Sequence, residues 1–271
     1  MNDEALLHLA RDAAWAGGAI VERHNRHVTG QRVAYSDKGS PIDLITAVDG
    51  ESEHAILAVL RRSGIAIVAE ESGGVAADAV WYVDPLDGTT NYAHGHPFCA
   101  ISIGLVIDGI PRLGVVHAPM LGVLFSGLAS GGGTRRDLFR GLEHPLRVSE
   151  VSKLDGALAA TGFPYDRRTS ADNNLDAFGA LTKQTHGVLR CGSASLDLAL
   201  VADGTYDAYW ERKLKPWDLA AGAALVMSAG GLVSDPWGAA FTAESGAIVA
   251  TNGAVHDELL AAIAPHQPRH V

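Results

Sequence analysis

Residues 81–92 have the sequence WYVDPLDGTTNY and form the most informative run in this chain of 271 residues. The apolar residues at the start of the run predict a buried strand that ends at Asp84, after which Pro85 turns the chain. Asp87 follows Asp84 by three positions, so the turn directs both carboxylates toward one point. Carboxylate oxygens are the ligands that Mg²⁺ prefers. The run therefore predicts a metal site at the end of a strand.

Small residues follow the second aspartate directly. Gly88, Thr89 and Thr90 can open a helix, and the free N–H groups at a helix start bind anions. A metal site beside a phosphate pocket is the arrangement that phosphoryl transfer needs. The structural alternative is an Asx-type turn with a helix cap, because Asp, Gly and Thr are common turn residues. The aspartate pair and glycine alone leave both interpretations open, whereas the whole run favours the chemical one.

Two more acidic segments occur at the boundaries of predicted elements. Glu70 and Glu71 follow a short apolar strand expected at residues 65–69. Adjacent carboxylates are usually a solvated surface pair, but the buried strand directs at least one of these into a cleft, where it can bind cations and orient a water molecule. Asp218 precedes a helix expected at residues 219–228, where it can act as N-cap and still offer one oxygen to a cation.

Candidates for the other side of a substrate pocket come from the second half of the chain. Residues 190–195, RCGSAS, open another helix with small side chains, which lets a sugar-like ligand approach the backbone. Glu211 follows an aromatic strand at residues 208–210 and can accept hydrogen bonds from hydroxyl groups. From spacing alone, a surface charge paired with Arg212 or Lys213 explains Glu211 equally well.

The remaining pattern predicts a mixture of helices and strands in two closely packed halves. Residues 1–150 combine helices at 4–24 and 49–62 with a largely antiparallel sheet, and residues 151–271 complete the active site. The tripeptide at 131–133, GGG, leads into a charged stretch and a seam near residue 150. In the second half we expect helices at about 172–183, 195–201, 219–228 and 256–263, with short strands at 158–161, 188–190 and 208–210 and around Leu232 and Ile248.

Composition limits the class of protein. Hydrophobic residues make up 47% of the chain and charged residues 19%, which excludes a disordered polypeptide. The formal net charge of −10 opposes binding to nucleic acid or to an anionic membrane. No apolar run approaches the roughly 20 residues that span a bilayer. The cysteines, Cys99 and Cys191, suggest free thiols in a reducing compartment, and the acidic N-terminus lacks the basic start of a signal peptide, so we expect a cytoplasmic protein.

The three acidic segments together resemble the inositol monophosphatase family, within the larger group of lithium-sensitive, Mg²⁺-dependent sugar phosphatases. The segment 38–49, KGSPIDLITAVD, is similar to the N-terminal element of that family, and order and spacing hold from about residue 5 to 260. The resemblance implies an α+β fold, a layered αβαβα sandwich of the inositol monophosphatase and fructose-1,6-bisphosphatase type, and a homodimer. One departure is the segment 131–136, GGGTRR, which puts the local hairpin in doubt.

The resemblance also implies roles for individual residues. Two or three Mg²⁺ ions would be bound by Glu70, Asp84, the carbonyl group of Leu86, Asp87 and Asp218, with Asp49 supporting a further, weaker ion. Thr89 and Glu70 would orient the attacking water, and with Asp87 they form the expected catalytic set. The substrate would be bound by Gly88, Thr89, Gly192, Ser193, Ala194, Glu211 and Asp218.

The expected activity is hydrolysis of inositol 1-phosphate or a related polyol phosphate by a metal-activated water, with no covalent nucleophile. Histidinol-phosphate and fructose-1,6-bisphosphate phosphatases share this scaffold and remain alternatives, because only the pocket walls differ. An alternative of another class is a regulatory protein that binds a partner and has incidental phosphatase activity. The expected partners are therefore a small phosphorylated polyol or sugar and a second copy of the chain, with neither nucleic acid nor membrane.

Overall fold

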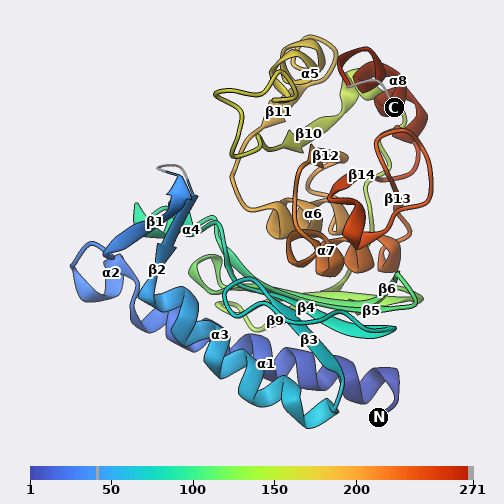
Figure 1. The fold of residues 1–271 in the computed structure, drawn as a ribbon. Coiled ribbons are helices and arrows are strands. Elements are labelled where there is room, and N and C mark those ends of the chain that lie inside the picture. Colours follow the sequence, from blue (N-terminus) through green and yellow to red (C-terminus); the bar gives the residue numbers. More distant parts are fainter. Residues whose placement is uncertain (41–42, 268–271) are drawn as a thin grey trace.

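The structure is a computed structural model that describes residues 1–40 and 43–267. Its elements form five layers, in which helices and sheets alternate (Figure 1). Two long helices lie at one end of the stack, followed by a large sheet, a second pair of helices, a smaller sheet and a last pair of helices. This architecture confirms the predicted α+β fold and its αβαβα layering.

The large sheet has seven strands in the order β3-β4-β5-β6-β7-β8-β9. β3 and β4 are parallel, and all the other neighbours are antiparallel. One face is covered by α1 (Asp3–Arg23) and α3 (Ala47–Leu60), which pack against each other. The strands are β3 (Ala66–Ala69), β4 (Ala79–Asp87), β5 (Ala100–Ile107), β6 (Ile110–Ala118), β7 (Val123–Leu128), β8 (Gly131–Asp137) and β9 (Leu142–Pro145).

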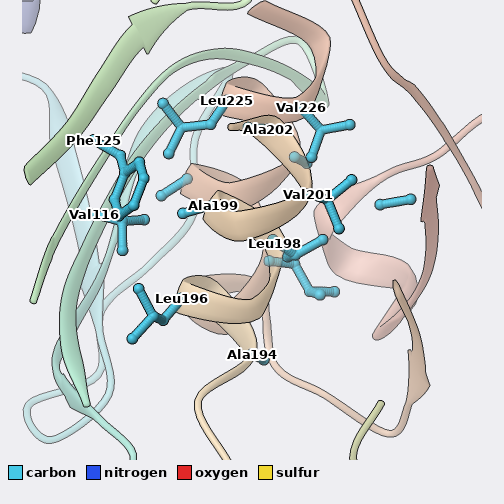
Figure 2. Packing of buried hydrophobic residues seen from close by; sticks show 14 of the residues in the cluster. Val116, Phe125, Ala194, Leu196, Leu198, Ala199, Val201, Ala202, Leu225 and Val226 are labelled. Atoms are coloured by element: carbon cyan, nitrogen blue, oxygen red, sulfur yellow. The ribbon is translucent and has the colours of Figure 1, made fainter. Parts of the chain in front are cut away.

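The middle layer consists of α6 (Ala194–Ala202) and α7 (Pro216–Ser228). α7 lies directly on the large sheet at two glycines: a Cβ atom on Gly104 would lie 2.6 Å from the backbone nitrogen of Ala221, and one on Gly114 would lie 2.1 Å from its carbonyl oxygen. Figure 2 shows side chains of α6 and α7 beside Val116 and Phe125 of the large sheet. This close packing fixes the height of the α7 N-terminus above β5.

The smaller sheet has five strands in the order β11-β10-β12-β14-β13. β10 is parallel to β11 and β12, whereas β14 is antiparallel to β12 and β13. The last helix layer, α5 and α8, packs on the side of this sheet away from the middle layer (Figure 1). The elements are β10 (Leu158–Thr161), α5 (Leu175–Leu181), β11 (Gly187–Leu189), β12 (Ala208–Arg212), β13 (Leu232–Ser234), β14 (Ala247–Thr251) and α8 (His256–Ile263).

Short elements complete the chain. A two-stranded antiparallel ribbon, β1 (Tyr35–Ser40) and β2 (Asp43–Thr46), precedes α3. Two short helices are α2 (Arg26–Thr29) and α4 (Thr89–Ala93), and α4 begins where the glycine and threonines of the 81–92 run predicted a helix start. Single turns of 3-10 helix occur at Arg61–Ser63, Pro119–Leu121, Leu154–Gly156, Ala243–Ser245 and Ala264–His266.

Two strand predictions need correction. β4 does not end at Asp84 but continues to Asp87, because a shift in its register against β5 accommodates Pro85. Asp84 lies opposite Ser102 and Asp87 opposite Ala100, so the irregularity leaves room for a residue without an N–H group. The glycines at 131–133 do not break the sheet: they begin β8, which pairs with β7 as an antiparallel hairpin.

The second half follows the predicted order with one shorter helix. α5 covers seven residues instead of the twelve expected at 172–183, and Asn174 before it adopts a left-handed backbone conformation. The two halves share buried side chains, since one core cluster joins Val80 and Tyr82 to Tyr209 and Ile248. The division near residue 150 itself stays a prediction. Among the described helices, none is both long and apolar enough to cross a bilayer.

Candidate active site

A cavity of about 500 Å³ lies between the carboxyl-terminal part of β4 and elements of the second half. Every predicted site residue lines it except Asp49. The residues that it brings together are Glu70, Asp84, Leu86, Asp87, Gly88, Thr89, Gly192, Ser193, Ala194, Glu211 and Asp218. Segments separated by more than a hundred positions therefore meet at one place, although the roles of these residues remain predictions.

Three carboxylates form the tightest cluster in the cavity. Asp84, Asp87 and Asp218 each offer an oxygen, and these oxygens all lie within 4.8 Å of one another. Burial raises the pKa of Asp84 well above its ordinary value, and the charges of Glu70, Asp87 and Asp218 add to the rise. Within residues 1–40 and 43–267, the cluster has no Lys or Arg within ion-pair distance. An all-oxygen group of mutually repelling carboxylates fits a divalent cation.

The second half of the chain holds Asp87 in place. Its Oδ2 atom accepts hydrogen bonds from the Ser193 hydroxyl at 2.7 Å, the Ser195 backbone N–H at 2.8 Å and the Ser195 hydroxyl at 2.6 Å. All three donors lie at the start of α6, so β4 of the large sheet is joined to the middle layer at this carboxylate. Burial raises the pKa of Asp87, whereas these donors oppose the rise. One of its carboxylate oxygens belongs to the cluster with Asp84 and Asp218.

Asp218 enters the cluster from the first turn of α7. The structural alternative that made it the N-cap is wrong, because α7 starts earlier, at Pro216, with Lys215 as N-cap. Asp218 occupies the third helical position, and its Oδ2 atom accepts the Lys215 backbone N–H at 2.7 Å. The carbonyl group of Trp217 accepts the Ser102 hydroxyl at 2.8 Å, which connects this turn to β5. Helix capping and presentation of a carboxylate are thus combined in one residue.

Glu70 lies beside the cluster and forms an ion pair with a lysine. Lys38 Nζ lies 2.9 Å from Glu70 Oε1 and 2.6 Å from Glu71 Oε1, so the two adjacent glutamates are not a free surface pair. Burial opposes the charged form of Lys38, but the two glutamates outweigh it and raise the pKa of the lysine. Lys38 lies in the segment that resembles the family, but no sequence pattern predicts its pairing with these glutamates.

The turn that carries Glu70 is positioned by Glu53 of α3, a residue that sequence reasoning missed. Its Oε2 atom accepts the Glu71 N–H at 2.9 Å, and its Oε1 atom accepts the Ser72 N–H at 3.0 Å. The residue is only 4% exposed. From the sequence, Glu53 looks like one of several charges on an amphipathic helix, so only the packing of α3 beside β3 and β4 reveals its task.

Asp49 lies behind the cavity wall and is fully buried. Its Oδ2 atom accepts the backbone N–H of Thr46 at 2.8 Å, which makes it part of the capping box of α3. Its Oδ1 atom accepts the Thr89 hydroxyl at 2.9 Å, and this hydroxyl also lies 3.0 Å from the carbonyl oxygen of Leu86. The observed task of Asp49 is therefore to orient Thr89 and to start α3, and its support of a metal ion stays a prediction.

Position 88 requires a glycine, both because of its backbone conformation and because neighbouring atoms leave no room for a side chain. Its φ angle is +93°, and a Cβ atom would lie 3.0 Å from the Phe98 carbonyl oxygen and 3.1 Å from that of Gly192. The Asn91 amide donates to the carbonyl groups of Phe98 and Cys191 at 2.7 and 2.8 Å, and it closes the same junction. The loop after β4 thus contacts the segment that begins α6.

Glu211 lines the same cavity as the metal cluster. It is 8% exposed, and its Oε2 atom accepts the Tyr209 hydroxyl. The surface-pair alternative is wrong, since Arg212 pairs with Asp172 and Lys213 with Asp166. Burial raises the pKa of Glu211 to about 7, with the Tyr209 hydrogen bond opposing the rise. An acceptor of this kind can bind hydroxyl groups of a substrate.

Two neighbours of Glu211 were also missed. Arg190 lines the cavity, and its Nη1 atom lies 3.0 Å from the place where a Cβ atom of Gly192 would be. Asp197 of α6 lines the same wall and is 2% exposed. Nothing in the sequence distinguishes Asp197 from other acidic residues near helix starts, because its burial depends on β12 and α7.

Comparison with known proteins assigns a family to this arrangement. The chain is 42% identical to the inositol-1-monophosphatase of Synechocystis, over 95% of this chain and 88% of that protein. It is 40% identical to a Pseudomonas aeruginosa protein named Nus factor SuhB, over 98% of both chains. The structure of inositol monophosphatase from Anabaena (Nostoc) matches with a TM-score of 0.85 and 41% identity, and covers 98% of this chain and 97% of that one.

The match to the family model extends over nearly the entire length, from residue 2 to residue 269. It agrees with the five-layered fold and with the acidic cluster at the end of β4. The chain belongs to the inositol monophosphatase family, a family of metal-dependent phosphatases, and is itself a phosphatase.

Proposed function

We propose that this phosphatase hydrolyses inositol 1-phosphate or a closely related polyol phosphate, with Mg²⁺ as its metal. The observation that carries the proposal is the cavity itself, which combines the cluster of Asp84, Asp87 and Asp218, here called the metal end, with the buried acceptor Glu211, here called the alcohol end. The metal end suits a phosphoryl group with cations, and the alcohol end suits a hydroxylated leaving group. The name of the Synechocystis relative agrees with this substrate.

Mg²⁺ fits the site because the clustered donors are hard oxygen atoms. Two or three ions would be held by Glu70, Asp84, the Leu86 carbonyl, Asp87 and Asp218, with Asp49 supporting the weakest ion. When bound, Mg²⁺ neutralises phosphoryl oxygens, lowers the pKa of water and stabilises the departing alkoxide.

The chain's own groups bind and orient the reactants. The Thr89 hydroxyl, fixed between Asp49 and Leu86, would orient the attacking water together with Glu70. The N–H groups of Gly88 and Thr89 would bind the phosphate, as free N–H groups at a helix start do. The alcohol would contact Gly192, Ser193, Ala194, Glu211 and Asp218.

A panel of phosphate esters tests the proposal. Release of phosphate would be measured with Mg²⁺ for inositol 1-phosphate, glycerol 2-phosphate, histidinol phosphate and fructose 1,6-bisphosphate. We expect inositol 1-phosphate to give the highest kcat/KM and a chelator to abolish turnover. A clear preference for histidinol phosphate over every polyol phosphate would contradict the proposed substrate.

One feature favours fructose 1,6-bisphosphate as the second candidate. Arg167 and Arg190 both line the cavity, and neither has a carboxylate within ion-pair distance among the described residues. Burial lowers the pKa of Arg167, and the charges of Arg190 and Arg168 lower it further. Crowded arginines can receive a second phosphate group. If this candidate is right, Arg167→Ala lowers kcat/KM for the bisphosphate far more than for inositol 1-phosphate.

A role in binding a protein partner is the alternative of another class, and the name of the Pseudomonas relative supports it. The acidic cluster is intact, so catalysis and such a role are separable by one substitution. If the Asp87→Asn protein restores wild-type behaviour to a deletion strain, the cellular role does not depend on phosphatase activity. If it fails to do so while the protein accumulates normally, catalysis carries the function.

We also propose a homodimer, inhibition by Li⁺ and a cytoplasmic location. The free thiols of Cys99 and Cys191 support a reducing compartment. Exposed aromatic side chains such as Phe139 and Trp237 are compatible with a protein interface. Light scattering would give the mass in solution, and a titration with Li⁺ at fixed Mg²⁺ would measure the inhibition.

A further inference from the structure

The strongest unassigned feature of the cavity is Asp197, in the first half of α6. Its backbone N–H donates to the carbonyl oxygen of Ser193, so the residue is held within the helix. Its side chain is 2% exposed although it lines the cavity. Carboxylates near a helix N-terminus are common because they interact favourably with the helix dipole. That interaction explains a negative charge at this position but not its burial in the cavity wall.

The hydrogen bonding of Asp197 is incomplete. Within residues 1–40 and 43–267, the buried Oδ1 atom has no donor at hydrogen-bond distance. Buried polar atoms in native proteins are nearly always paired, with protein or with an ordered molecule. A charged oxygen needs such a partner more than a neutral one does. Because Asp197 lines the cavity, a molecule bound there can supply a donor to the carboxylate.

The surroundings of Asp197 favour a neutral donor over a second metal ion. Asp197 is not part of the close cluster of Asp84, Asp87 and Asp218. Burial raises the pKa of Asp197, the charges of Glu211 and Asp87 add to the rise, and Arg190 opposes it. Arg190 thus supplies positive charge on this side, where Glu211 also accepts the Tyr209 hydroxyl. Hydroxyl groups are the donors that such a wall can bind.

A glycine in the wall lets the Glu211 carboxylate pack closely against the backbone. A Cβ atom on Gly162 would lie 2.2 Å from Glu211 Oε1, so any larger residue at this position would push the carboxylate aside. Gly162 and Gly192 both line the cavity. Small residues and two buried carboxylates thus line the same cavity.

We propose that Asp197 is a specificity-determining residue, whose carboxylate accepts a hydrogen bond from a hydroxyl group of the leaving alcohol, directly or through one bridging water. The inference rests on the proposed function, because it requires a polyhydroxylated leaving group. It adds an acceptor beside Glu211, so that the enzyme would recognise hydroxyl groups at two points of the substrate.

The test compares two substrates in two variants of this residue. Asp197→Asn preserves the shape of the side chain and removes its charge, whereas Asp197→Ala removes both oxygens. For each protein, kcat/KM would be measured with inositol 1-phosphate and with p-nitrophenyl phosphate, whose leaving group offers no donor in its ground state. We expect the ratio of the two constants to fall about tenfold or more, since a site built to bind a hydroxyl depends strongly on that contact.

The matched control is Asp203→Asn, at the opposite end of the same helix. Asp203 is also largely buried, but it does not line the cavity and lies 3.5 Å from Arg135. Its substitution should change the melting temperature without changing the substrate ratio. An unchanged ratio in both Asp197 variants, with equal losses for both substrates, would overturn the inference and make the residue structural.

The wild-type rates separate this outcome from failure of the proposed function. If wild-type protein hydrolyses p-nitrophenyl phosphate but no polyol phosphate of the panel, the proposed substrate class is wrong, and the inference falls with it. If it hydrolyses polyol phosphates and the Asp197 variants retain the wild-type ratio, only the inference is wrong.

Discussion

The two ends of the cavity hold their carboxylates in different ways. At the metal end, Asp84, Asp87 and Asp218 lie so close that each raises the pKa of another. At the alcohol end, Glu211 has the Tyr209 hydroxyl and the charge of Arg190 beside it. The first arrangement needs cations to balance it, whereas the second is balanced by the protein. Substitutions at the metal end should therefore affect every substrate, and those at the alcohol end should affect the choice of substrate.

The largest effect is expected for Asp87→Asn. The change removes a charge from the cluster, and an amide cannot accept all three hydrogen bonds that now end on Oδ2. We expect kcat to fall by about 10³-fold or more for every ester in the panel, as for groups that act as a unit. Steady-state assays at saturating Mg²⁺ measure this, with Asp137→Asn, whose carboxylate pairs with Arg140 away from the cavity, as control. A loss of this size for one substrate, with the other esters hydrolysed at wild-type rates, would contradict the division into two ends.

A smaller effect is expected for Glu53→Gln, which acts on the metal end from outside the cavity. One of the two N–H groups of the Glu70–Ser72 turn would face an amide NH₂ group and lose its acceptor. We expect kcat to fall about 10- to 100-fold and the free energy of unfolding to fall by about 1–3 kcal/mol. Assays and thermal unfolding measure both, with Glu143→Gln on the exposed strand β9 as control. Wild-type activity in a destabilised protein would show that the turn tolerates movement.

The metal end was predictable because its chemistry is nearly continuous in the sequence. Asp84 and Asp87 are three positions apart, and the intervening proline already required an irregular strand end. The extension of β4 through Pro85 was not predictable, since it depends on the register against β5. Glu53 was missed for a similar reason: its partners are backbone N–H groups, which no side-chain pattern reveals.

The alcohol end was less accessible to sequence reasoning. From spacing alone, Glu211 could either bind a ligand or form a surface ion pair. Only the tertiary structure, in which Arg212 pairs with Asp172, excludes the ion pair between Glu211 and Arg212. Asp197 was not singled out, because an acidic residue near a helix start is ordinary. Its burial arises from elements brought together by the fold. The order of elements and the Asp84–Asp87 pair therefore followed from local patterns, and the layers and the full ligand set from the family resemblance, whereas the specificity wall required the assembled structure.

The pH dependence of substrate choice distinguishes the two ends more finely. Burial raises the pKa of Glu211 to about 7, so the carboxylate accepts hydrogen bonds fully only above that pH. Below it, Glu211 takes up a proton and loses acceptor capacity. We expect the kcat/KM ratio of inositol 1-phosphate to p-nitrophenyl phosphate to fall by up to about tenfold from pH 8 to pH 6, one unit of pKa corresponding to a factor of ten.

Using a ratio removes the pH-dependent contributions of the enzyme that are common to both substrates. Glu211→Gln should make the ratio independent of pH, because an amide does not titrate. A flat profile in the wild-type protein would mean that Glu211 does not contact the alcohol. A pH-dependent ratio that persists in the variant would assign the titration to another group.

The smallest effect is expected for Ser193→Ala, at the junction between the two ends. Ser193 donates to Asp87 from the segment that also forms the alcohol wall, but the Ser195 N–H and hydroxyl still hold the same oxygen after its loss. One hydrogen bond to a charged group contributes about 1.5–3 kcal/mol at most, and the two remaining donors compensate part of it. We expect the Mg²⁺ concentration for half-maximal activity to rise about threefold, with the substrate ratio unchanged.

Ser195→Ala should have a similar effect on this Mg²⁺ concentration. The effect of the double substitution should exceed the product of the two single effects, because all three donors share one acceptor. Strict additivity would mean that Asp87 is held by the fold of β4 alone and not by α6.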